Sequence, residues 1–149
     1  MTEIYFYHLE RQPLETALTT LLERSVGRGW NAVVQASSSE RVDALDTLLW
    51  TYAEDSFLPH GTAKDGHPEL QKVFLTTGDE NPNEAQVRFL VDGAGLPDVS
   101  DYARAVYMFD GRDEAAVTEA RLQWKAAKGL GHALSYWQQD DNGRWVNRA

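Results

Sequence analysis

The chain has 149 residues, of which 42% are hydrophobic and 25% charged, and its formal net charge is -9. This composition is typical of one globular domain with a sizeable core and argues against disorder. The absence of cysteine excludes disulfides and thiolate metal sites, and with no signal peptide at the N-terminus we expect a cytoplasmic protein. No apolar run approaches the roughly 20 residues of a membrane span, so no membrane association is expected.

The strong negative charge bears on the kind of partner. A body with 23 acidic and 14 basic residues is repelled by phosphate backbones. We therefore expect no direct DNA binding, unless a local basic patch exists.

Segments with apolar residues on both faces predict strands, and segments with an apolar stripe at helical spacing predict helices. The predicted strands cover residues 4–9, 30–36, 72–76, 86–91 and 103–109, and the predicted helices cover 13–26, 37–49 and 113–128. Ser37, with Glu40 three residues later, indicates a capping box at the start of the second helix. Residues 62–69 are expected to form a loop. Residues 133–138 and 144–146 predict a hairpin, because Asn142-Gly143 favours a tight turn.

Strands that alternate with helices predict a single three-layer α/β domain over residues 1–149, with a mainly parallel, Rossmann-like sheet and a C-terminal antiparallel hairpin. Such sheets often bind nucleotides, but the first strand-to-helix turn, Leu9-Glu10-Arg11-Gln12-Pro13, contains no glycine. A phosphate cradle needs small residues there, so the turn opposes a phosphate site. A small α/β enzyme or nucleotide-binding module of unknown substrate remains the alternative.

Candidate catalytic and metal-binding residues are few. No serine lies in a Gly-x-Ser-x-Gly elbow, and no thiol nucleophile exists. His60 and His67, with Asp65 and Glu69 nearby, could gather a metal ion, but His60 could equally bond a loop carbonyl and the acids suit a solvated loop. We expect no metal, no cofactor and no active site.

One apolar segment does not fit a simple core. On the second helix, Trp50 lies roughly 140° from Leu45, which belongs to the inner stripe, so Trp50 is expected to point outward. The segment Phe57-Leu58-Pro59-His60 follows in a connection where small polar residues are usual. Together they predict an apolar surface patch for a partner.

The last helix predicts a second surface. Its packing stripe is expected to contain Leu122, Ala126, Gly129 and Leu130. Trp124 lies opposite that stripe, flanked by Val117, Arg121, Lys125 and Lys128. An indole beside three cations is suited to a short acidic peptide with an apolar anchor. Single-stranded nucleic acid stacked on Trp124 is the weaker alternative.

Three motifs resemble the chi subunit of bacterial DNA polymerase III, and their order and spacing cover nearly the whole chain. They are Phe6-Tyr7-x-Leu9, then Leu45-Asp46-x-x-Leu49-Trp50 with Ser56-Phe57-Leu58-Pro59-His60, and Ala120-Arg121-x-x-Trp124-Lys125. The resemblance implies a non-catalytic subunit of the clamp-loader assembly. Such a subunit links the replicase to the acidic C-terminal tail of single-stranded-DNA-binding protein.

The resemblance also implies site residues. The tail would bind Arg121, Trp124, Lys125 and Lys128, with Val117 and Phe109 as an apolar wall. Asp110 departs from the family pattern at this wall and would repel an acidic tail. The second surface, Trp50 with Phe57, Leu58, Pro59 and His60, resembles the one that docks the psi subunit or, in competition with it, a helicase.

Overall fold

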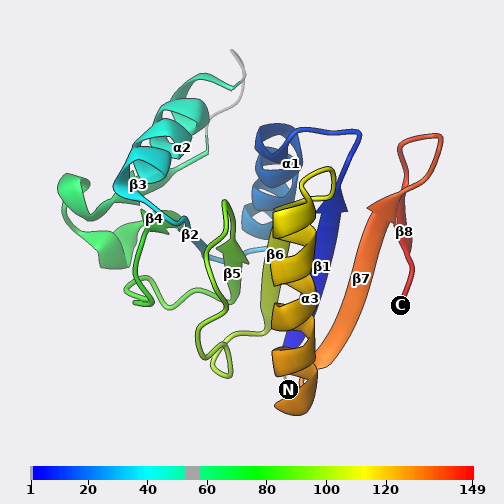
Figure 1. Ribbon diagram of the computed structural model, residues 1–149. Coiled ribbons are helices and arrows are strands. Elements are labelled where there is room, and N and C mark those ends of the chain that lie inside the picture. The colour runs from blue at the N-terminus through cyan, green and yellow to red at the C-terminus, as the bar shows by residue number, and fades with distance from the viewer. Residues whose placement is uncertain (1, 53–57) are drawn as a thin grey trace.

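The computed structural model describes residues 2–52 and 58–149 and contains one eight-stranded sheet (Figure 1). Its strand order is β3-β4-β2-β5-β6-β1-β7-β8, and every neighbouring pair is parallel except β7–β8. The strands are β1 (Glu3–Leu9), β2 (Ala32–Gln35), β3 (His60–Thr62), β4 (Val73–Thr76), β5 (Val87–Leu90), β6 (Arg104–Asp110), β7 (Ala133–Gln139) and β8 (Trp145–Asn147). The helices are α1 (Leu14–Gly27), α2 (Ser39–Thr51) and α3 (Glu114–Gly129), with two short 3-10 turns at Ala63–Asp65 and Pro68–Leu70.

The helices cover the sheet from both sides. Helices α1 and α2 pack on one face, and α3 packs on the other, in front of β6 and β1 in Figure 1. Strand β1 shows the division: Tyr7 packs with the α1 side, whereas Phe6 packs with the α3 side, because successive side chains of a strand alternate between faces. The predicted three-layer α/β class is confirmed.

The predicted elements agree with the structure, with two local corrections. The second helix is capped by Ser38, whose side chain accepts a hydrogen bond from the Arg41 backbone N–H at 3.3 Å, so the predicted capping box at Ser37 is wrong. Strand β3 pairs with β4 and had not been predicted, because three residues are too few to show a strand pattern. The hairpin is confirmed, and Gly143 has the positive φ of 78° that its turn requires.

The predicted packing stripe of the third helix is wrong. Leu122 and Leu130 are 57% and 76% exposed, whereas Ala120 and Ala127 are buried against the sheet. The sheet presents the bulky rings of Phe6 and Tyr107 on this face. Since these rings fill the space between the layers, α3 approaches with its small side chains and carries the leucines outside.

Within residues 2–52 and 58–149, no helix has the length and apolar character needed to cross a bilayer.

Candidate protein-docking sites

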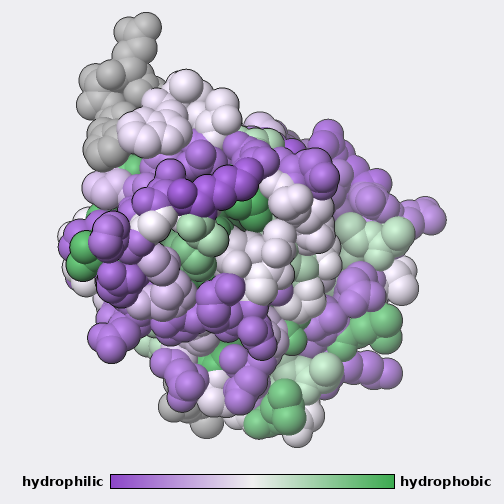
Figure 2. Space-filling view, turned by 90° about the vertical axis from the view of Figure 1, so that its left-hand side faces the viewer, coloured by the Kyte–Doolittle hydropathy of each residue, from purple (hydrophilic) through white to green (hydrophobic). Residues whose placement is uncertain are grey.

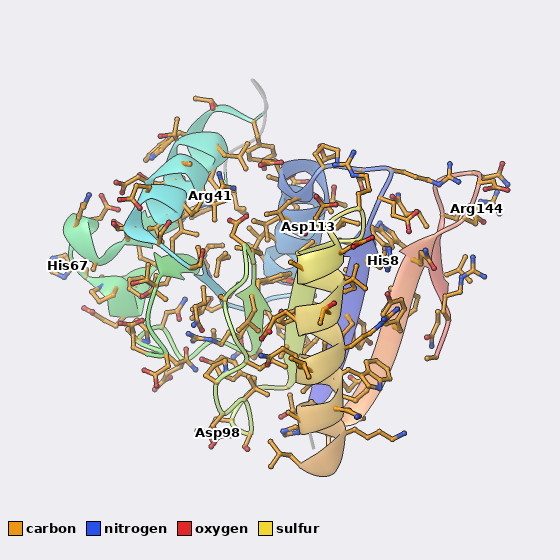
Figure 3. The ribbon with its side chains drawn as sticks, in the orientation of Figure 1. His8, Arg41, His67, Asp98, Asp113 and Arg144 are labelled. Carbon is orange, nitrogen blue, oxygen red and sulfur yellow. The ribbon has the colours of Figure 1, made fainter. Side chains whose placement is uncertain are left out.

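The α3 surface, as we name it, is the flank of α3 that faces β7, together with the strand residues next to it. Asp113 caps the helix by accepting hydrogen bonds from the backbone N–H groups of Ala115 and Ala116 at 3.0 and 3.5 Å, and it lies at the start of α3 in Figure 3. From this start, Val117, Arg121 and Trp124 follow at helical spacing on one flank. Lys125 and Lys128 extend the same flank toward the end of the helix.

Aromatic rings from three strands meet this flank. The Trp124 ring packs edge-on against Phe6 of β1, with 5.1 Å between ring centroids, and against Tyr136 of β7 at 6.1 Å. Phe109 of β6 lies 6.1 Å from the Tyr136 ring. Trp124 is therefore half-buried, not fully outward as its place on the helix suggested, and Val117 and Phe109 do lie in the same cluster.

His8 and Tyr136, which also lie at this surface, were not predicted from the sequence. The His8 Nδ1 of β1 hydrogen-bonds the Tyr136 hydroxyl, and the His8 Nε2 lies 2.6 Å from the Glu10 carboxylate. Gly111 permits this position, because a Cβ there would lie 1.9 Å from the His8 ring. Burial raises the pKa of Tyr136, and the positive charge of Arg121 opposes that rise. The sequence does indicate that His8 lies on the same face of the sheet as Phe6, because side chains alternate along a strand.

The cations of this surface are available. Arg121, Lys125 and Lys128 are exposed, and in the described part of the chain no carboxylate lies within 4.0 Å of any of them. Asp110, by contrast, accepts hydrogen bonds from the Arg112 backbone N–H at 2.9 Å and from its guanidinium at 3.4 Å. These bonds lower the pKa of Asp110, and Arg112 offsets the charge that would repel an acidic ligand.

The second predicted site, whose described residues are Trp50, Leu58, Pro59 and His60, is named the Trp50 surface, and it lies at the other end of the sheet. Leu45 and Leu49 are on the buried side of α2, whereas Trp50 is 58% exposed. The predicted outward direction of Trp50 is therefore confirmed. Its ring meets the His60 ring edge-on, with 5.0 Å between centroids. Figure 2 views the β3 side of the molecule and shows a mainly hydrophilic face with small apolar areas.

His60, the first residue of β3, supports the Trp50 ring. The His60 side chain is fully buried, with Nδ1 2.7 Å from the Leu58 carbonyl oxygen and Nε2 3.1 Å from the Asp46 carboxylate. Leu58 is only 3% exposed and belongs to the core with α2, so the expectation that it lies on the surface is wrong. Pro59 is exposed. Phe57 lies outside the described residues.

A cavity of about 570 Å³ lies at the carboxyl ends of β1 and β6, between the starts of α1 and α3. Doubly wound sheets commonly bind ligands at this position, where neighbouring strands connect in opposite directions. Here the lining contains five carboxylates, from Glu15, Asp92, Asp110, Asp113 and Glu119. Negative charge of this density opposes a nucleotide phosphate. In the residues that the structure describes, no group of three or more His, Asp or Glu side chains is arranged to hold a metal ion.

The fold and these surfaces define a doubly wound α/β protein that has an acidic cavity at the position where such folds often bind ligands, an exposed Trp50 and a half-buried Trp124. A model of the family described as "DNA polymerase III chi subunit, HolC" matches residues 1–135. The chain therefore belongs to the DNA polymerase III chi subunit family, which confirms the resemblance. It is also similar to a probable DNA polymerase III subunit chi of Rickettsia prowazekii (strain Madrid E), with 27% identity over 107 residues, or 70% of this chain. The match spans 65% of the length of that relative.

Proposed function

We propose that the chain is a non-catalytic accessory subunit in DNA replication, which binds the acidic C-terminal tail of single-stranded-DNA-binding protein and connects it to the replicase through the clamp-loader assembly. Membership of the chi family supports the accessory role. The observation that carries tail binding is the α3 surface, where three cations border a half-buried indole and have no carboxylate within 4.0 Å among the residues described.

Each part of the α3 surface suits one part of such a tail. The Arg121 guanidinium can donate two parallel hydrogen bonds to the terminal carboxylate. An apolar terminal side chain can rest on Trp124 and Val117, which leave part of their surface open. Lys125 and Lys128 lie where acidic side chains further along the tail would pass, and they raise the rate of encounter by attraction.

The test is titration of a fluorescently labelled acidic peptide ending in Pro-Phe, followed by anisotropy. Arg121→Ala removes a charge-assisted contact of about 1.5 to 3 kcal/mol, which corresponds to roughly 10- to 150-fold weaker binding. Added salt is expected to weaken wild-type binding. Lys64→Ala is the control, because Lys64 is an exposed cation at the opposite end of the sheet, beside β3. Equal affinity of wild type and Arg121→Ala would defeat the assignment.

A second docking role is proposed for the Trp50 surface, whose described residues are Trp50, Leu58, Pro59 and His60. We infer that it receives a psi subunit or a helicase. Trp50 is an exposed indole packed edge-on against the buried His60 ring, and tryptophan is the kind of residue that dominates protein interfaces. Leu58 and His60 are both buried, so their role at the Trp50 surface is structural.

The two docking roles can be separated by experiment. Trp50→Ala should abolish capture of purified psi subunit or helicase in a pull-down, while the acidic peptide still binds. Capture that survives Trp50→Ala would contradict the role of this surface.

A further inference from the structure

The sheet face opposite α3 carries a cavity that neither docking role uses. It has a volume of about 300 Å³, and α1, the sheet and the β7–β8 hairpin enclose it. We name it the arginine cavity. Its lining includes Arg24, Arg28, Arg104, Tyr5, Trp137 and Trp145.

The charge of this lining is the reverse of that of the whole chain. It contains three arginines and no acidic residue, in a protein with a net charge of -9. Within the described residues, Arg24 and Arg28 have no carboxylate within 4.0 Å, and the nearest for Arg104 is Glu3 at 3.9 Å. The local basic patch that nucleic-acid contact would require is therefore present.

Aromatic rings form the floor and one wall of the arginine cavity. Trp137 of β7 stacks beside Tyr5 and Tyr7 of β1, with ring centroids 5.7 and 6.3 Å apart and planes inclined by 29° and 21°. Trp145 of β8 meets Tyr7 edge-on at 4.8 Å. Tyr5, Trp137 and Trp145 are half-buried and line the cavity.

The arginines lie close to these rings. The guanidinium carbon of Arg104 is 4.4 Å from the centroid of Tyr5. Arg28 lies 4.1 Å from the centroid of Trp30, at the margin of the cavity. Arg24, Arg104 and Tyr7 line the cavity together, where burial raises the pKa of Tyr7 and the charges of Arg104 and Arg24 oppose that rise.

Helix electrostatics accounts for only part of this arrangement. Arg24 and Arg28 stand at the C-terminal end of α1, where cations are stabilised by the helix dipole. Arg104 comes from β6, and its Nε atom is buried and has no hydrogen-bond partner among the described residues. The dipole of α1 does not explain why Arg104 converges on the same space.

We propose that the arginine cavity binds single-stranded nucleic acid over about two nucleotides, which are flanked by three phosphates. Phosphates would lie against Arg24, Arg28 and Arg104, and a base would rest on the rings of Tyr5 and Trp137. Cations along a path beside open aromatic rings are the combination that binds single strands without sequence preference. An acidic peptide could pair with the arginines, but its acidic side chains have no aromatic ring to stack on Tyr5 or Trp137. The inference goes beyond tail binding and does not depend on it.

The test is anisotropy of a labelled oligothymidylate of about 12 nucleotides, within the usual range of site sizes, with the full chain and no other protein at low salt. Three phosphate contacts predict a slope of about -2 for the logarithm of affinity against the logarithm of salt concentration, at roughly -0.7 per contact. Arg24→Gln and Arg28→Gln should each make that slope shallower by about 0.7. Both side chains are exposed, so folding should be retained. The charge-matched control Lys64→Gln should change neither slope nor affinity.

A second comparison tests the rings. An abasic deoxyribose-phosphate chain of the same length is expected to bind roughly 5- to 150-fold more weakly, because it lacks the stacking of a base on an aromatic ring. Three results would each overturn the proposal. They are no oligonucleotide binding at low salt, equal slopes for wild type and both arginine variants, and affinity for the abasic chain or an equally charged acidic peptide that matches the oligonucleotide.

Discussion

Arg88 is the buried charge on which the stability of the β5 region is expected to depend. Its side chain is fully buried in β5, although no carboxylate lies within 4.0 Å in the described part of the chain. It donates instead to neutral oxygens. The partners are the Gln35 side chain at 2.7 and 3.1 Å, the Tyr102 hydroxyl at 2.9 Å, the Glu80 carbonyl at 2.9 Å and the Gly78 carbonyl.

Arg88→Ala removes all of these donors at once. Each buried acceptor left unpaired costs about 1 to 3 kcal/mol, and four different acceptors lose their donor here. Water that enters the vacated space recovers part of the loss, so we expect the free energy of unfolding to fall by about 3 to 5 kcal/mol. That is a large share of the roughly 5 to 15 kcal/mol of an average domain.

The measurement is urea unfolding followed by circular dichroism. Arg88→Lys keeps the charge but loses the planar fork, so its midpoint should fall between wild type and Arg88→Ala. Lys64→Ala, at an exposed position, should stay within about 0.5 kcal/mol of wild type. A loss below about 1 kcal/mol for Arg88→Ala would refute the reasoning, because it would mean that the five contacts contribute no net stability.

Two further predictions concern α2 and the tyrosines. Leu49→Ala should lower the free energy of unfolding by about 2 to 5 kcal/mol, because Leu49 is 1% exposed, whereas Trp50→Ala should cost about 1 kcal/mol or less. Equal losses in urea unfolding would contradict the orientation of the helix. Burial raises the pKa of Tyr7, Tyr107 and Tyr136 above the ordinary 10.0. Above pH 10 the unfolded chain loses these protons first, so the free energy of unfolding should fall as the pH rises. Near-ultraviolet absorbance should show late-titrating tyrosines, and one transition at the ordinary pKa would exclude them.

Local patterns predicted most of the fold. The strands and helices follow from apolar periodicity, and the hairpin follows from Asn142-Gly143. The direction in which α3 faces could not be predicted from the helix alone. It is decided by the rings of Phe6 and Tyr107, which belong to other elements, so that alanines face the sheet and Leu122 stays outside.

Local sequence patterns could not predict the arginine cavity, for a related reason. Arg24, Arg104 and Trp137 are far apart along the chain, and they meet only because β6, β1 and β7 are neighbours in the sheet. Local periodicity indicates that a sheet forms, but it does not determine the order of the strands. Arg88 was missed for a different reason, since one charged residue in an apolar strand resembles an edge position until its partners are known.

Strand β1 serves as a common wall between the α3 surface and the arginine cavity. Phe6 and His8 project to one side, and Tyr5 and Tyr7 project to the other. A shift of the strand by a single residue would exchange these two sets and ruin both surfaces together, so pairing with β6 and β7 must be held in one register. Substitutions that shift the register of β1 would consequently impair both proposed binding roles at once. Variants that leave the sheet untouched can come from the helices, where Arg24 and Arg121 each border one surface alone.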